Sequence, residues 1–283
     1  MATVDHFSHG VLNPAFAFAL AFLGSGLALS CAAQARATGS THRTRWLTLA
    51  SMSLGGGIWL MHFMAMLGFD ISDTPLRYGT GLTAVSALLA VVVVFVGLLV
   101  AGSGRPTPLR IISGGVFTGA GVSGMHYTGM AAIRIAGSLT YDANLVLASV
   151  LVAIVAAIVA LWLFSVVRGR GQVLIAGGVM AVAVCAMHYT AMAAVRVHLD
   201  DNWYGTVQGV TPISLELPIT LVAAVALVVL AFVALQTVSS EDRNLPANPT
   251  NRSGAPAAQA PATFATANRS SVPRMTGRGL HHR

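Results

Sequence analysis

Runs of apolar residues long enough to cross a lipid bilayer recur along the chain. A membrane-spanning helix needs about 20 mostly apolar residues, because the hydrocarbon core is about 30 Å thick and a helix rises about 1.5 Å per residue. Only 9% of the 283 residues are charged, against roughly 25% in a soluble domain. We therefore expect an all-α polytopic membrane protein. The runs predict seven transmembrane helices, at residues 12–33, 46–67, 80–101, 110–133, 143–165, 173–195 and 213–237.

The placement of arginines predicts how these helices are oriented. The linkers after the first, third and fifth helices carry no acidic residue, and they contain Arg36, Arg43, Arg45, Arg105, Arg110, Arg168 and Arg170. Basic residues near membrane spans stay in the cytoplasm. We expect a protein of the bacterial inner membrane with its N-terminus outside and its C-terminus in the cytoplasm. The net charge of +7 then indicates contact with anionic lipid headgroups, not with nucleic acid.

One short pattern of methionine, histidine and an aromatic residue occurs three times. It reads Met-His-Phe-Met-Ala-Met from position 61, Met-His-Tyr-Thr-Gly-Met from 125 and Met-His-Tyr-Thr-Ala-Met from 187. This spacing indicates an internal repeat of about 62 residues, in which each motif helix is paired with a companion helix. The motif helices are the second, fourth and sixth, which cross the membrane in the same direction. We therefore expect all three motifs near the outer face.

The motifs contain a donor set suited to a soft metal ion. Residues i and i+4 share a face of a helix, so each histidine lies on the same face as the last methionine of its motif. The first methionine lies on the shoulder of that face. Imidazole and thioether donors favour a copper-like ion, and ionisable groups inside a membrane span usually mark function. The predicted ligands are Met61, His62, Met66, Met125, His126, Met130, Met187, His188 and Met192.

Structural roles compete with these functional interpretations. A methionine in a membrane helix usually only packs, and one buried histidine is usually a hydrogen-bonded structural residue. Three matched copies favour a shared site. Tyr127 and Tyr189 follow two of the histidines, and we expect them either to orient the imidazoles and any bound ligand or to lie in the aromatic belt of the membrane. Cys185, one turn before His188, is first a small buried hydrophobe and only secondarily an extra soft ligand.

Small residues on the motif helices predict close helix packing. Gly115 and Gly119 form a small-xxx-small pair on the fourth helix, and Gly55 to Gly57 precede the first motif. Because small side chains let helix backbones approach, we expect these glycines either to draw the three motif helices together or to serve ordinary packing between membrane helices.

The composition changes after residue 238. The remaining 45 residues are rich in proline, alanine, asparagine, threonine and arginine and contain few large apolar side chains. Such a segment cannot bury a core and is expected to be disordered. The sequence thus predicts a membrane domain at 1–238 and a disordered cytoplasmic tail at 239–283.

The Met-His-Tyr-Thr strings at 125–128 and 187–190, with their triplicated spacing, resemble the MHYT domain, a bacterial integral-membrane sensory module. The resemblance covers roughly residues 10–240. It implies a copper site near the outer membrane face and the sensing of O2, CO or NO. The first copy departs from the pattern, with Phe63 for tyrosine and Met64 for threonine. It is expected to bind metal without contributing hydrogen bonds around the ligands.

We interpret the chain as a sensor and not as an enzyme, because no set of nucleophile and base is visible in it. Arrival of a diatomic gas or copper at the site is expected to shift the motif helices, and a separate cytoplasmic partner is expected to read the shift. A copper transport or delivery protein is an alternative, although the ligands cluster at one face and not at the midplane. Haem held by His/Met pairs is a second alternative.

Overall fold

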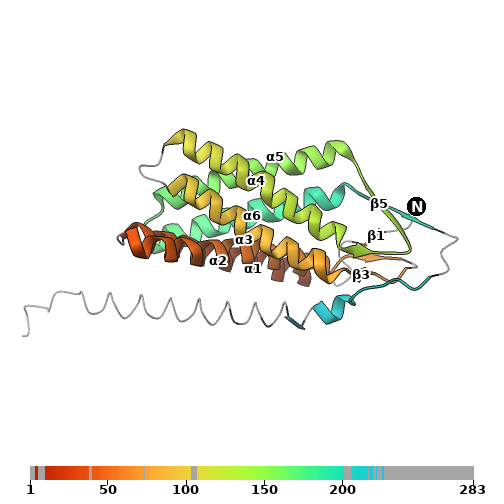
Figure 1. The fold of residues 1–283 in the computed structure, drawn as a ribbon. Coiled ribbons are helices and arrows are strands. Elements are labelled where there is room, and N and C mark those ends of the chain that lie inside the picture. Colours follow the sequence, from red (N-terminus) through yellow and green to blue (C-terminus); the bar gives the residue numbers. More distant parts are fainter. Residues whose placement is uncertain are drawn as a thin grey trace, which may run out of the picture. The chain divides into compact units, whose positions relative to one another are not determined.

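The computed structural model describes residues 4–5, 10–37, 40–72, 74–102, 107–200, 205–215, 217–218, 221 and 225. Most of these residues belong to six long helices (Figure 1). They are α1 (Leu12–Ala37), α2 (Ser40–Met66), α3 (Thr80–Gly102), α4 (Pro108–Ala131), α5 (Ala143–Val166) and α6 (Arg170–Ala193).

These helices confirm the first six predicted spans, with ends that differ by a few residues. The largest difference is at α2, which begins at Ser40, so that Arg43 and Arg45 lie inside a helix instead of a linker. Arginine is a good helix former, and its long side chain reaches water from a helix end. The predicted seventh helix lies mostly outside the described residues, but the described positions from 212 onward there are helical. The predicted tail at 239–283 lies wholly outside them.

Within the described residues, five helices are long and apolar enough to cross a membrane, namely α1, α2, α3, α5 and α6. The remaining helix, α4, has 24 residues and is therefore equally long, but its glycines, serines and threonines make it less apolar. It packs between α3 and α5. The protein is an all-α, multi-pass membrane protein built from a repeated unit.

The six helices pack as a closed ring in chain order. Each helix contacts the next one along the chain, and α1 closes the ring against α6. The motif helices α2, α4 and α6 therefore alternate with the companion helices α1, α3 and α5. The motif helix α2 also touches α4 and α6 across the ring. This arrangement points one face of every motif helix toward a common axis.

Glycines let neighbouring helices of the ring approach closely. A Cβ atom at Gly119 would lie 2.4 Å from Cα of Ile154, and one at Gly115 would lie 2.4 Å from Cγ1 of Ile158, both on α5. The prediction that these glycines draw the motif helices together was therefore wrong. They hold α4 against its companion α5, because the neighbours of a motif helix in the ring are companion helices.

Short strands cover one end of the ring, which we call the strand end. They form three antiparallel pairs: β1 (Val4–Asp5) with β2 (Asp70–Ile71), β3 (Arg77–Tyr78) with β4 (Ile133–Arg134), and β5 (Gly137–Tyr141) with β6 (Val195–Leu199). These strands were not predicted from the sequence. A signal was present in β6, where buried Val195 and Val197 alternate with exposed Arg196 and His198.

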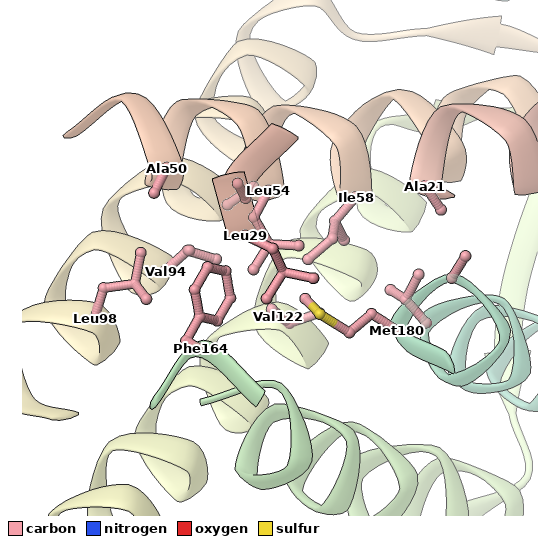
Figure 2. Packing of buried hydrophobic residues seen from close by; sticks show 14 of the residues in the cluster. Ala21, Leu29, Ala50, Leu54, Ile58, Val94, Leu98, Val122, Phe164 and Met180 are labelled. Atoms are coloured by element: carbon pink, nitrogen blue, oxygen red, sulfur yellow. The ribbon is translucent and has the colours of Figure 1, made fainter. Parts of the chain in front are cut away.

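Two clusters of buried apolar side chains fill the ring. The larger one runs through the middle of the bundle and contains Leu54, Ile58, Val122 and Met180 (Figure 2). The second lies at the strand end and includes Tyr78 of β3 with residues of β4 and β6. The candidate site lies where the two clusters meet.

Candidate metal centre

The three motif histidines converge from three different helices. His62, His126 and His188 lie within the last two turns of α2, α4 and α6, and each is 1% exposed. Nδ1 of His62 lies 3.2 Å from Nδ1 of His126 and 3.2 Å from Nδ1 of His188. The three ring centroids are 4.8, 5.1 and 5.2 Å apart. The repeat places equivalent side chains at equal depth, and the ring brings them to its axis.

Hydrogen bonding alone does not account for this arrangement. Each imidazole nitrogen offers either one proton or one lone pair, so Nδ1 of His62 can form only one good hydrogen bond to the two Nδ1 atoms that it faces. A cation would accept a lone pair from all three rings. Two nitrogens bound to one ion at about 2.0–2.1 Å in a tetrahedral arrangement lie about 3.3–3.4 Å apart, close to the observed separation. The residues present therefore fit a bound metal ion.

Two imidazole nitrogens on the other side of the rings have no partner. Nε2 of His62 and Nε2 of His126 are buried and accept or donate no hydrogen bond. An unpaired buried polar group costs about 1–3 kcal/mol. Two such atoms on converging rings therefore need an explanation other than packing, and a functional site provides one.

The histidine layer stands between two sets of methionines. All six predicted methionine ligands are at most 3% exposed. The first methionine of each motif packs in the larger core cluster, and the last packs in the cluster at the strand end; the sets are Met61, Met125 and Met187, and Met66, Met130 and Met192. Thioether groups are thus available near the histidines. Their role as ligands stays a prediction.

An aromatic ring stands edge-on to each histidine. The ring centroids of the two neighbours are 4.8 to 5.0 Å apart and their planes are 79° to 87° apart, in the pairs His62–Phe63, His126–Tyr127 and His188–Tyr189. Phenylalanine in the first copy therefore keeps the ring contact and loses only the hydroxyl group. Such edge contacts restrict how each imidazole can turn.

The hydroxyl of Tyr127 anchors α4 to α5. It lies 2.8 Å from the hydroxyl of Ser149, so the tyrosine touches His126 through its ring and not through its oxygen. In the first copy, the indole of Trp59 donates instead to Ser86, at 3.0 Å. Ser86 and Ser149 are fully buried and occupy equivalent positions of the repeat. Sequence reasoning missed both serines, whose only signal was their spacing of about one repeat.

Gly129 is a further site residue that sequence reasoning missed. A Cβ atom there would lie 2.5 Å from Nε2 of His62, so the backbone of α4 forms a wall against this imidazole. The other copies have Ala65 and Ala191 at the equivalent position. This single difference was the available signal. Cys185, the secondary ligand candidate, is a half-buried free thiol outside the group of potential ligands found in the described residues.

Comparisons with known proteins identify the same threefold repeat. The family model described as "Bacterial signalling protein N terminal repeat", the MHYT repeat, matches residues 55–114, 119–177 and 182–247. No solved structure matches the chain.

Three curated relatives illustrate the similarity. The bifunctional diguanylate cyclase/cyclic di-GMP phosphodiesterase MucR of Pseudomonas aeruginosa is 35% identical over 69% of this chain and 29% of its own length. The cyclic di-GMP phosphodiesterase NbdA of the same organism is 38% identical over 54% of this chain and 20% of its own length. The signaling protein YkoW of Bacillus subtilis is 32% identical over 55% of this chain and 20% of its own length.

The chain thus spans less than a third of the length of these relatives, and the similarity lies in the MHYT region. The family model covers well over half of the chain, and each of its three matches contains one of the converging histidines. The protein is therefore a member of the MHYT family of bacterial membrane signalling proteins.

Proposed function

We propose that this protein senses a small ligand through a copper-like ion held by His62, His126 and His188. The ligand is a diatomic gas (O2, CO or NO) or copper itself. The observation that carries the proposal is the buried histidine layer, in which Nδ1 of His62 lies 3.2 Å from Nδ1 of both His126 and His188. Three neutral imidazoles flanked by thioethers are a donor set that favours copper over magnesium or calcium.

The residues around the layer have separate tasks in this proposal. The imidazoles hold the ion, the adjacent aromatic rings keep the imidazoles from turning, and the methionines offer additional soft donors. A bound copper ion would supply an open position for a gas. The cluster at the strand end covers the histidines and excludes water from them.

The ring of helices provides a way to transmit a change at the histidines. Each motif helix lies between two companions, with contacts so close that glycine is required at several of them. A movement of an imidazole therefore shifts its helix against both neighbours. At the opposite end, Arg36 donates to the carbonyl groups of Phe164 and Val167, and Arg43 donates to that of Gly102. These bonds tie the helix ends where a cytoplasmic partner would read the shift.

Cyclic di-GMP turnover is the output that we propose. Two of the relatives named above make or degrade this nucleotide, and they share the membrane region with this chain. We therefore place the catalytic step in a cytoplasmic partner, and the sensing step in the six-helix ring.

Two alternative occupants fit the site less well. Haem needs a slot for its macrocycle, whereas the cavity next to the histidine layer has a volume of only about 50 Å³. Transport of copper ions needs a continuous path of ligand atoms, whereas the lining of that cavity is mostly aliphatic. Both observations favour a fixed ion in a sensor.

Metal analysis of variants tests the proposal. We expect the protein purified in mild detergent to retain copper, and we expect His126→Ala and His188→Ala to lose it. His198→Ala is a matched control, because His198 is exposed on β6 and lies outside the histidine cluster. Retention of copper by both His126→Ala and His188→Ala would refute the metal centre. A strong Soret band would establish haem, and copper-dependent flux in proteoliposomes would establish transport.

A further inference from the structure

A small apolar cavity lies on the side of the histidine layer away from the strand end. Its volume is about 50 Å³, and residues from all six helices line it. A single water needs about 10–15 Å³ measured in this way, and cavities with apolar walls stay dry and take up apolar guests such as xenon. The space is thus large enough for one small apolar molecule.

The position of the cavity follows from the helical repeat. Ile58, Val122 and Val184 line it, and each precedes a motif histidine by four residues on the same helix face. Leu54, Thr118 and Met180, which precede the histidines by eight residues, also line it. Figure 2 shows Leu54, Ile58, Val122 and Met180 in the same part of the core. The cavity therefore lies on the axis, about 6–12 Å from the imidazoles by the helical rise.

Met187 connects the cavity to the metal centre. Its side chain lines the cavity, and the next residue in the chain is His188. Met187 therefore lies both at the wall of the cavity and next to a candidate ligand.

The cavity results from a difference between two companion helices. Its wall on α5 includes Ala156 and Ala157, whereas the positions 63 residues earlier on α3 are Val93 and Val94. The smaller side chains leave space toward α5 that α3 fills. The two alanines thus account for the empty volume. Valine is the natural replacement at both positions, because it occupies the equivalent positions of α3.

We propose that this cavity, lined by Ile58, Val122, Val184 and the alanines of α5, holds one molecule of an uncharged diatomic gas beside the histidine layer. The inference rests on the proposed function for the identity of its guest. Gases of this class are apolar and dissolve in lipid, and a dry space in the membrane interior concentrates them. The walls reject ions and water, because only Ser25 and Thr118 bring polar atoms to them.

Xenon is the probe for the first test. The protein is labelled at its methionine methyl groups and studied by NMR in detergent under xenon pressure. We expect the resonances of Met180 and Met187, which line the cavity, to shift, and that of Met52, which is 57% exposed, to stay unchanged. The double variant Ala156→Val/Ala157→Val should lose the shift. Ala186→Val, at an exposed position of α6 outside the cavity, should keep it.

Two results would overturn the cavity assignment: no xenon shift at Met180 and Met187, or an equal shift in the double variant. An unchanged Met66 resonance confirms that the variant is folded, and Ala157→Val alone replaces the double variant if the double variant does not fold.

The second measurement is the rate of the optical response to CO in copper-loaded protein. We expect it to be slower in the double variant at unchanged copper content, and an unchanged rate would refute delivery from the cavity. A xenon shift in a protein that binds no copper would refute the metal centre and leave the cavity assignment supported.

Discussion

Replacing Gly129 by alanine should displace His62 without unfolding α4. The added Cβ would lie 2.5 Å from Nε2 of His62, whereas ordinary contacts begin at 3.4 Å. The imidazole must therefore move by about 0.9 Å to restore a normal separation. Phe63 and the other two imidazoles pack against the ring and leave it little free space. A metal site tolerates displacements of only about 0.2 Å in its ligands, so the site should be disturbed.

We expect the affinity for copper to fall by about 10–100-fold, the range found when the support of a metal ligand is lost. The fold should persist, because alanine stabilises a helix by about 0.8–1.0 kcal/mol relative to glycine. The assay is a competition titration of Cu(I) against a coloured chelator, with circular dichroism to confirm the helix content.

Gly124→Ala is the matched control on the same helix. Its Cβ would lie 3.7 Å from Cδ2 of Leu89, which is an ordinary contact. This variant should bind copper like the unmodified protein. If Gly129→Ala is folded and also binds copper with unchanged affinity, then His62 is not a ligand held in place by the wall of α4, and the reasoning fails.

Three further substitutions test the packing around the site. Gly119→Ala should lower the melting temperature strongly, because the backbone of Ile154 stands 2.4 Å from the new Cβ, whereas Gly178→Ala, with no atom within 4 Å, should not. Tyr127→Phe removes the hydroxyl bond to α5 and should cost about 0.5–1.5 kcal/mol in chemical unfolding at unchanged copper content. Arg36→Gln should cost roughly 1–3 kcal/mol by the same measurement, because the last carbonyls of α5 lose a charged donor.

The histidine layer is the part of the site that the sequence could predict. The lengths of the apolar runs predicted the spans, and their alternation across the membrane predicted a common direction for the three motif helices. Equal spacing then placed His62, His126 and His188 at one depth. Local sequence pattern and the thickness of the bilayer act on each helix separately, so they can be recognised without knowing how the helices pack. The structure adds that the three rings touch.

The order of the helices in the ring could not be predicted in the same way. Gly115 and Gly119 indicate a close helix–helix contact, but the sequence does not identify the helix on the other side of it. The contact partner is set by the packing of the whole ring, where each motif helix has two companions as neighbours. Gly129 was missed for a related reason, since its importance depends on an imidazole 67 positions away in the chain.

The three copies of the repeat are not identical around the histidine layer, and their differences can give a helix movement a direction. A metal ion on the axis requires only three equal imidazoles, and strict repetition would provide them. A ligand arriving in a fully symmetric site would push the three motif helices equally and would favour no direction of movement. Gly129, Ala156 and Ala157 break this symmetry, because the first brings His62 against α4 and the others open space toward α5. Both changes involve the α4–α5 pair, and we therefore expect ligand binding to move this pair most. Hydrogen exchange measured with and without CO should change more in α4 and α5 than in α1 and α2, and an equal change in all helices would contradict the expectation.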